Sequence, residues 1–491
     1  MLFNSIPFFI FFPIVVMLYF LIPQKFRYIW LLIASYYYYM FLNPKYVVFL
    51  IFSTIVTYFG GMIVQNASTT GKKKLAVAIS VLLNLSMLLF FKYSNFISEI
   101  FSSICSAFGL SIAKTDFHLI LPVGISFYTF QSLSYLIDSY RNEVKVEKNI
   151  FKYALFVSFF PNILAGPIER SKNLIKQFDE RHTFDYARVR DGLLLMLWGY
   201  FQKVVIVARL SILTDMVYGD ISSYSGTVLA LATVCYGLEI YCDFASYSSI
   251  AIVAAKVMGF ELMTNFKQPF FSRSTAEFWR RWHISLNTWF RDYLYIPMGG
   301  SRVSKFRKYV NLMIVFLASG LWHGDRLTYL LWGAANGLFQ IIGDLLKPLR
   351  QKICSILHYD FSNWIGQFIK IAFTFFLFHV SLVFFCAGSV TEALTIFKKI
   401  LTEIDLNIFL NGTLYQLGLG VMNFYLLLLS LIVLLIVDLF KEHTDALRFL
   451  SDRHWIIRWG IYYLLISATL LSCNLSTQEF LYMNFGRELF F

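Results

Sequence analysis

The sequence predicts an all-α protein that crosses a membrane many times. Two features of its composition support this: 58% of the 491 residues are hydrophobic, and only 14% are charged. A soluble domain carries about a quarter charged residues. A third observation is that several apolar runs approach the roughly 20 residues that a membrane-spanning helix needs. We expect about eleven or more transmembrane helices, with re-entrant and interfacial helices, around a central cavity.

The expected spans are apolar runs separated by short basic or polar loops. They cover residues 6–22, 28–42, 46–66, 75–91, 192–212, 227–259, 328–346, 364–387, 417–440 and 455–473. The run 227–259 allows one very long helix or two segments joined at Asp243. Residues 95–113 are amphipathic and shorter, so we expect them to lie along the membrane surface.

Two further stretches are too irregular to be simple spans. The helix expected at 119–141 carries hydroxyls and an amide on several faces, which allows either a cavity lining or hydrogen bonds between helices. The stretch 156–174 is interrupted by Pro161, Gly166 and Pro167. Because proline removes a backbone donor and clashes with the preceding turn, we expect a broken or re-entrant helix there.

The net charge of +13 fits a membrane protein better than a nucleic-acid-binding protein. Basic residues gather in short loops beside apolar runs, at Lys72–Lys74, Arg302–Lys308 and Lys347–Lys352. Such clusters indicate cytoplasmic loops and contacts with anionic lipid head groups of the membrane. No nucleic-acid-binding motif accompanies the charge, so we expect no nucleic-acid partner.

The six cysteines are scattered and lie mostly in apolar runs, where cysteine behaves as a small hydrophobe. We therefore predict no disulfide framework and no metal site. The first apolar run lacks a leading basic residue and a cleavage site for a signal peptidase, so we expect it to remain as a helix.

Two ionisable residues inside expected spans have structural explanations. Asp243 is costly at membrane depth unless it is paired, so we expect an ion pair with an Arg or Lys of the amphipathic stretch that begins near residue 268, rather than a catalytic carboxylate. His379 lies alone in an apolar helix, and we expect it to be a hydrogen-bonded core residue.

The stretch 268–337 differs from the rest of the chain because it is polar and aromatic before it becomes apolar. Ser274 and Glu277 form a capping-box pattern, which predicts a helix that begins at Thr275. Residues at three- and four-residue steps would form one face of this helix: Trp279, His283, Leu286 or Asn287, and Phe290. The turn-forming residues 297–300 would end it.

The arginines of this helix are candidates for binding a phosphorylated ligand. A guanidinium group matches phosphate geometry, so we expect Arg280, Arg281 and Arg291 to attract such a ligand from the cytoplasm. The simpler interpretation is an interfacial amphipathic helix, in which Glu277 pairs with Arg281 one turn later.

His323 is the strongest catalytic candidate. It ends the apolar run, within Trp322-His323-Gly324-Asp325. Imidazole can accept and return a proton near neutral pH, as acyl transfer to a hydroxyl requires. Gly320 and Gly324 would allow a backbone or substrate to approach closely. Other nucleophile and phosphate-loop motifs are absent from the sequence.

The central stretch resembles a known family. The residues that carry the resemblance are NFKQPFFSRSTAEFWRRWHISLNTWFRDYLYIPMGGSR and LASGLWHG, supported upstream by PVGISFYTFQSLSYLID and FFPNILAGPIERSKNLIKQF. They resemble the membrane-bound O-acyltransferase family, and within it the bacterial alginate-type polysaccharide O-acetyltransferases. The resemblance covers most of residues 119–340 and implies one membrane domain over 1–491, with 119–340 as its catalytic core.

The resemblance also implies roles for individual residues. The family's catalytic histidine falls on His323, and an earlier motif histidine falls on His283, in a supporting or cavity-lining role. The remaining residues expected to bind substrate are Trp279, Arg280, Arg281, Asn287, Arg291, Asp292 and Trp322. The donor substrate would be acetyl-CoA, which enters from the cytoplasm, and no permanently bound cofactor is expected.

The C-terminal tail, 474–491, contains a second resemblance. Phe480, Tyr482 and Phe485 are similar to a terminal aromatic pattern of bacterial envelope acylation systems, in which the tyrosine is thought to carry the acyl group. A phenol ester is activated enough to pass an acyl group onward. The alternative is that these aromatic residues anchor the tail at the membrane interface.

Together these observations predict transfer of an acetyl group across the bacterial cytoplasmic (inner) membrane to a cell-envelope polysaccharide. The transfer would proceed through a hydroxyl relay, a secreted or periplasmic acetyltransferase partner, or both. One alternative is D-alanyl or other acyl transfer from a carrier-protein thioester. Another is a transporter or flippase, although the sequence lacks the paired broken helices typical of transporters.

Overall fold

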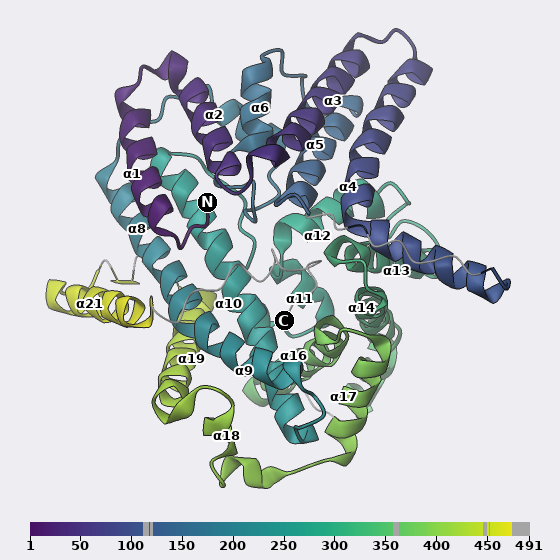
Figure 1. Cartoon of the computed structure of the whole chain (residues 1–491), viewed down its shortest axis with the longest axis vertical. Helices are drawn as coiled ribbons and strands as arrows, with labels where there is room; N and C mark the ends of the chain where they lie inside the picture. Colours follow the sequence, from purple (N-terminus) through teal and green to yellow (C-terminus); the bar gives the residue numbers. More distant parts are fainter. Residues whose placement is uncertain (111–116, 118–120, 357–362, 445–448, 451, 474–491) are drawn as a thin grey trace. The chain divides into compact units, whose positions relative to one another are not determined.

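A computed structural model describes residues 1–110, 117, 121–356, 363–444, 449–450 and 452–473 (Figure 1). In this part of the chain every regular element is a helix. The residues group into two compact units: one contains Met1–Met196 and Tyr247–Thr264, and the other contains Leu197–Ser246 and the described residues from Asn265 onward. Helices α8 and α10 belong partly to each unit. The expected single domain over 1–491 stays a prediction.

The first unit contains the N-terminal helices. They are α1 (Ile6–Leu21), α2 (Gln24–Met40), η1 (Pro44–Tyr46), α3 (Val47–Asn66), α4 (Thr70–Ala107), α5 (Ile125–Tyr140), α6 (Ile150–Ser158), α7 (Ser171–Gln177) and the start of α8 (Tyr186–Tyr200). The expected span at 75–91 lies within α4, which is long and apolar enough to cross a membrane, but the expectation of a separate surface segment at 95–113 was wrong. A single helix, α4, extends through both as far as Ala107, because no glycine or proline interrupts residues 72–107.

Buried polar groups of this unit are joined by hydrogen bonds between helices. Gln131 of α5 donates to the carbonyl of Phe156 in α6, and the Tyr153 hydroxyl donates to Thr57 of α3 over 2.7 Å. Ser53 donates to Asn84 over 2.6 Å. Of the two alternatives for 119–141, the bond from Gln131 favours hydrogen bonding between helices.

The stretch 156–174 is a broken helix, as predicted. Helix α6 ends at Ser158, a turn carries Pro161, Gly166 and Pro167, and α7 begins at Ser171. The preceding helix, α5, begins at Ile125, directly after Gly124, whose φ of 78° is left-handed. A Cβ at this position would lie 2.2 Å from the carbonyl oxygen of Ile163, so only glycine fits against the turn.

The second unit contains the end of α8 and most of the remaining helices. They are η2 (Phe201–Val207), α9 (Ala208–Gly219), most of α10 (Gly226–Met258), η3 (Pro269–Phe271), α11 (Thr275–Arg281), α12 (Ile284–Phe290), η4 (Arg291–Tyr295), α13 (Lys305–His323), α14 (Leu327–Leu345), α15 (Lys347–Ile356), α16 (Trp364–Cys386), α17 (Val390–Thr402), η5 (Leu406–Phe409), α18 (Thr413–Gln416), α19 (Gly420–His443) and α21 (Trp455–Ser472). Helix α10 is one continuous helix, which settles the two alternatives for 227–259.

Seven helices of the described residues are long and apolar enough to cross a membrane: residues 44–66, 70–107, 186–219, 226–258, 364–386, 420–443 and 455–472. Helix α1 is apolar but shorter. The all-α, multi-pass class is therefore confirmed, while the count of about eleven spans stays a prediction.

Asp243 forms an ion pair, but its partner differs from the expected one. The carboxylate of Asp243 on α10 lies 2.5 Å from the ammonium group of Lys203 on η2, and both side chains are buried. Lys203 lies outside the amphipathic stretch that was expected to supply the cation. Lys203 lies in η2, the π-helical part in the middle of the 186–219 span.

Helices α13 and α14 form an antiparallel pair, and His323 lies at the end of the pair where a short loop connects the two helices. A Cβ at Gly320 would lie 2.4 Å from the carbonyl oxygen of Tyr329, and a Cβ at Gly333 would lie 2.4 Å from that of Phe316. The glycines therefore permit the close contact of the two helices that the sequence predicts at Gly320.

Candidate active site

The amphipathic stretch begins as predicted, because Ser274 accepts a hydrogen bond from the backbone amide of Glu277 and α11 starts at Thr275. It is not one continuous helix, however. Helix α11 ends at Arg281, and α12 begins at Ile284. Between them His283 has φ 42° and ψ 55°, a left-handed conformation that is rare for a residue with a Cβ. The chain therefore turns at His283 instead of placing it on a continuous helical face.

Two asparagines hold this break in place. The backbone carbonyl of Asn265 accepts from the amide of Ile284 over 2.9 Å, and its side-chain oxygen accepts from Ser285 over 3.3 Å. The amide of Asn287 donates to the carbonyl of Trp282 over 2.6 Å. These bonds satisfy backbone groups that the break would otherwise leave unpaired, and they stabilise the strained conformation of His283.

His323 is the last residue of α13 and is surrounded by aromatic rings. Its imidazole centroid lies 5.2 Å from Trp322, 5.0 Å from Trp332 and 5.3 Å from Phe385, with planes inclined by 77–83°. Only 9% of the residue is exposed. Trp332 comes from α14 and Phe385 from α16, so three helices fix the position of this ring. Aromatic pairs favour this edge-to-face geometry.

The two histidines lie on either side of Trp322. The centroid of the His283 ring is 5.7 Å from Trp322, which in turn is 5.2 Å from His323. Phe244 of α10 packs against His283 at 4.6 Å. Burial lowers the pKa of His283 from 6.5 to about 3. His283 is therefore a neutral imidazole at physiological pH, because its charged form would lose its hydration.

Trp279 extends the aromatic cluster from α11. Its ring lies 5.5 Å from Trp332 and 5.5 Å from Phe316. The structure thus brings Trp279, His283, Trp322 and His323 together in one unit, and Trp332 completes the cluster. These four were predicted from the sequence as catalytic or substrate-binding residues, and their roles stay predictions.

The predicted phosphate-binding residues do not gather with this cluster. Arg281 donates two hydrogen bonds to Glu442 of α19, of 2.6 and 2.8 Å, and it pairs with Glu277 over 2.7 Å. The hydrogen bonds that Glu442 accepts, followed by the negative charges of Glu442 and Glu277, raise the pKa of Arg281 above its usual value. The guanidinium group therefore joins α11 to α19 and has two acids as partners.

The other charged residues of this stretch lie nearer to solvent. The side chain of Arg280 is exposed. Arg291 pairs with its neighbour Asp292 over 2.8 Å, and 59% of the arginine side chain is exposed. Asn287, also predicted to bind substrate, directs its amide to the backbone of the break at His283. Arg280 and Arg291 thus remain accessible to an anion.

Trp332, Phe385 and Phe244 contact the two histidines but were not singled out from the sequence. Phe385 lies more than 60 residues after His323, so no local pattern connects the two. Trp332 carries a weak signal, because it lies nine residues after His323 and directly before Gly333, on the helix that was expected to follow it. His379, by contrast, lies 2.8 Å from the carbonyl of Phe375 in its own helix, consistent with a core residue.

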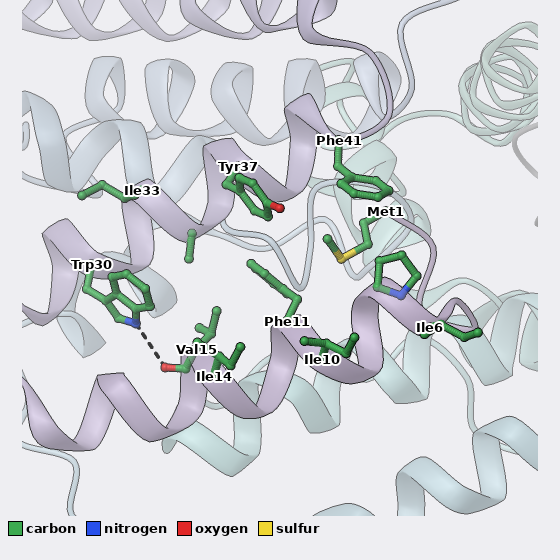
Figure 2. A pocket seen from close by; sticks show the side chains of 12 residues that line it. Met1, Ile6, Ile10, Phe11, Ile14, Val15, Trp30, Ile33, Tyr37 and Phe41 are labelled. Carbon is green, nitrogen blue, oxygen red and sulfur yellow. Dashed lines mark hydrogen bonds between the residues drawn. The ribbon is translucent and has the colours of Figure 1, made fainter.

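The described part of the chain brings together no group of three or more His, Cys, Asp or Glu side chains that could hold a metal ion. Tyr482 and the rest of the tail 474–491 lie outside the described residues. An apolar pocket of about 560 Å³ lies in the first unit, between α1 and α2 (Figure 2). Trp30 of α2 donates across it to the carbonyl of Val15 over 3.1 Å. No residue predicted for the active site lines this pocket.

Comparison with known proteins decides the family. Residues 77–389 match the family model described as "MBOAT, membrane-bound O-acyltransferase family". The chain belongs to the membrane-bound O-acyltransferase family. This match includes α11, α12, α13 and α14, and therefore both histidines of the cluster. The expected enzyme class, an O-acyltransferase, and the multi-pass membrane character are thereby confirmed.

The names of individual relatives of this O-acyltransferase refer to acyl transfer to alginate, peptidoglycan or teichoic acid. The probable alginate O-acetylase AlgI of Pseudomonas putida is 40% identical over 345 residues, which is 70% of each protein. The peptidoglycan O-acetyltransferase of Helicobacter pylori is 31% identical over 396 residues, 75% of this chain and 73% of that protein. The teichoic acid D-alanyltransferase of Streptococcus thermophilus is 30% identical over 243 residues, 45% of this chain and 56% of that protein.

Proposed function

We propose that this O-acyltransferase takes an acetyl group from acetyl-CoA on the cytoplasmic side of the bacterial inner membrane and passes it towards a cell-envelope polysaccharide. The observation that carries the proposal is the position of His323, buried at the end of α13 among Trp322, Trp332 and Phe385. The names of the relatives, an alginate O-acetylase and a peptidoglycan O-acetyltransferase, support an acetyl group and a polysaccharide acceptor.

In the proposed reaction His323 acts as general base. Its imidazole takes the proton of an acceptor hydroxyl while the hydroxyl oxygen attacks the thioester carbonyl of acetyl-CoA. The tetrahedral intermediate collapses, the C–S bond breaks, and the CoA thiolate receives the proton from the imidazolium. A positioned base of this kind contributes about 10²–10⁴-fold to the rate. The apolar rings around His323 exclude water, which would otherwise compete with the acceptor for the acetyl group.

The first acceptor in this proposal is the phenol of Tyr482, and a secreted or periplasmic acetyltransferase then moves the acetyl group to the polysaccharide. The support for Tyr482 is the resemblance of the tail to the terminal aromatic pattern. Arg280 and Arg291 are exposed and are proposed to attract the phosphates of CoA.

The test uses the purified full chain in nanodiscs with radiolabelled acetyl-CoA, and compares wild type with His323→Ala and Tyr482→Phe. The proposal predicts label on the wild-type protein and on neither variant. Hydrolysis of acetyl-CoA without label, lost only in His323→Ala, would keep the enzyme and reject the tyrosine relay. If His323→Ala acquired label at the wild-type rate, the role of His323 would be refuted.

A second candidate is D-alanyl transfer from a carrier-protein thioester, favoured by the similarity to the D-alanyltransferase of S. thermophilus. That match covers less of the chain than the matches to the O-acetyl enzymes. The same assay with a D-alanyl carrier protein distinguishes the two, because only the correct donor is consumed. Since the chain is an O-acyltransferase, the transporter alternative is set aside.

A further inference from the structure

Two basic loops that are far apart in the sequence lie at the same end of the α13–α14 pair. Lys308, in the first turn of α13, donates to the carboxylate of Asp344, in the last turn of α14, over 2.7 Å. The hydroxyl of Tyr309 donates to the same carboxylate over 3.1 Å. These bonds bring residues 302–308 next to the start of α15. We call this surface, made of residues 302–308 and 344–356, the basic end.

The basic end carries a large excess of positive charge. Among residues 302–308 and 344–356, Asp344 is the only acid, and it is already paired with Lys308. The cations of this surface are Arg302, Lys305, Arg307, Lys308, Lys347, Arg350 and Lys352. All of them except Lys308 are exposed. Within these two ranges seven cations accompany a single acid, and such an excess of positive charge favours an anionic partner.

Large apolar side chains are interleaved with these cations and are also exposed. Phe306 is 79% exposed, Leu349 is 52% exposed and Ile356 is 64% exposed. Leu349 and Ile356 are seven residues apart on α15, so they lie on one face of this helix, two turns from each other. Lys352 lies between them on this face, one turn from each. A short helix whose exposed apolar residues are bordered by cations is typical of segments that lie in a membrane interface.

We propose that the basic end binds the anionic head groups of phospholipids in the adjoining leaflet, with Leu349 and Ile356 inserted at the boundary of the acyl chains. The cations supply attraction to phosphate, and the apolar residues select a lipid surface over a soluble phosphate, which offers them nothing to contact. A nucleic acid would likewise leave the apolar side chains in water. The surface therefore fits an anionic bilayer.

The basic end is separate from the candidate active site. Lys305 and His323 are at opposite ends of α13, and 18 residues of helix rise span about 27 Å. Lipid binding there would hold the end of the α13–α14 pair that contains Lys305 at the membrane surface. His323 lies at the other end, where the connecting loop joins the two helices. The inference does not depend on the donor or acceptor of the proposed reaction.

The experiment measures lipid binding to the full chain by native mass spectrometry. Phosphatidylglycerol and phosphatidylcholine with the same acyl chains are titrated separately, and the ratio of their dissociation constants gives the preference for anionic lipid. The variant Lys347→Gln/Arg350→Gln/Lys352→Gln removes three cations. Since one cation near an anionic surface changes affinity about fivefold, we expect the preference to fall about a hundredfold. The variant Leu349→Ser/Ile356→Ser is expected to weaken binding of both lipids.

The matched control is Lys172→Gln/Lys176→Gln/Arg181→Gln, which removes three exposed cations from a surface that also carries Asp179 and Glu180. It should leave the preference unchanged. The proposal is overturned if the control loses as much preference as the test variant, or if the test variant keeps the wild-type preference. Displacement of the lipid by adenosine 3′,5′-bisphosphate, with Leu349→Ser/Ile356→Ser binding as well as wild type, would assign the surface to a soluble phosphate and also overturn it.

Discussion

The indole of Trp332 packs edge-to-face against the imidazole of His323, with centroids 5.0 Å apart and planes inclined by 82°. Trp279 contacts the same indole from α11 at 5.5 Å. Trp332 is therefore one of the residues through which the two halves of the 268–337 stretch meet. It fixes the ring of His323 from one side while it holds α11 against α14.

From this contact we predict that Trp332→Leu lowers the rate of acyl transfer about 100-fold, because a small displacement of a catalytic group has an effect of that order. Trp332→Phe keeps a flat ring and should retain most of the activity. Initial rates with acetyl-CoA measure both, and Trp364→Leu, at a tryptophan that is 79% exposed, is the control. A wild-type rate in Trp332→Leu would show that the ring contact has no part in positioning His323.

Substitutions in the ion pair of Lys203 and Asp243 distinguish a structural role of Asp243 from a catalytic one. Asp243→Asn removes the carboxylate that pairs with the buried ammonium group of Lys203, so we expect the free energy of unfolding to fall by about 3–5 kcal/mol. The double variant Lys203→Met/Asp243→Leu removes both charges and should recover most of the stability and the activity. Denaturation in a detergent series measures stability. A stable but inactive double variant would mean that Asp243 takes part in the reaction.

The lowered pKa of His283 predicts a dependence of stability on pH. The unfolded chain binds a proton at this residue below about pH 6.5, whereas the folded protein does not until about pH 3. The stability that His283 contributes is therefore present above pH 6.5 and is lost as the pH falls towards 3. Between pH 6.5 and 5 the loss is about 2 kcal/mol.

Thermal unfolding of wild type, His283→Gln and His454→Gln over this pH range tests the prediction. His283→Gln should lose this part of the acid dependence, since glutamine does not titrate. His454 is exposed, and its variant should follow wild type. Parallel curves for wild type and His283→Gln would contradict the burial of the neutral ring.

Two glycines of the α13–α14 pair, Gly320 in close contact and Gly343 in open space, allow a matched comparison of alanine substitutions. Gly320→Ala would place a Cβ 2.4 Å from the carbonyl oxygen of Tyr329, so the helices must separate, and we expect a loss of about 1–3 kcal/mol in stability and lower activity. Gly343→Ala, on α14, meets nothing within 4 Å and should be neutral or slightly stabilising. Equal effects of the two substitutions on unfolding temperature would argue against close packing at Gly320.

Local chemistry explains which parts of the site could be predicted from the sequence. The start of α11 at Thr275 follows from the hydrogen bond between Ser274 and Glu277, whose residues are three apart. The close helix contact at Gly320 follows from the missing side chain. The family resemblance drew attention to His283 and His323 because their motifs are long and specific.

The predictions that were wrong or incomplete depended on contacts between residues that lie far apart in the sequence. The break at His283 is held by Asn265, which comes from outside the helical pattern and gives no signal within it. The partner of Asp243 is 40 residues away, on a helix whose packing decides which cation reaches the carboxylate. Phe385 contacts His323 only because α16 packs against α14. A pattern within one segment cannot predict such contacts.

The proposed role of His323 is tested most directly by comparing two histidine variants in one assay. His323→Gln and His379→Gln both replace a buried histidine of the second unit, but only His323 is proposed to accept a proton from the acceptor. We predict that His323→Gln reduces acetyl transfer from acetyl-CoA about 10²–10⁴-fold at unchanged unfolding temperature, while His379→Gln retains transfer in proportion to its folded fraction. A folded His323→Gln enzyme with the wild-type rate would contradict the central role of His323.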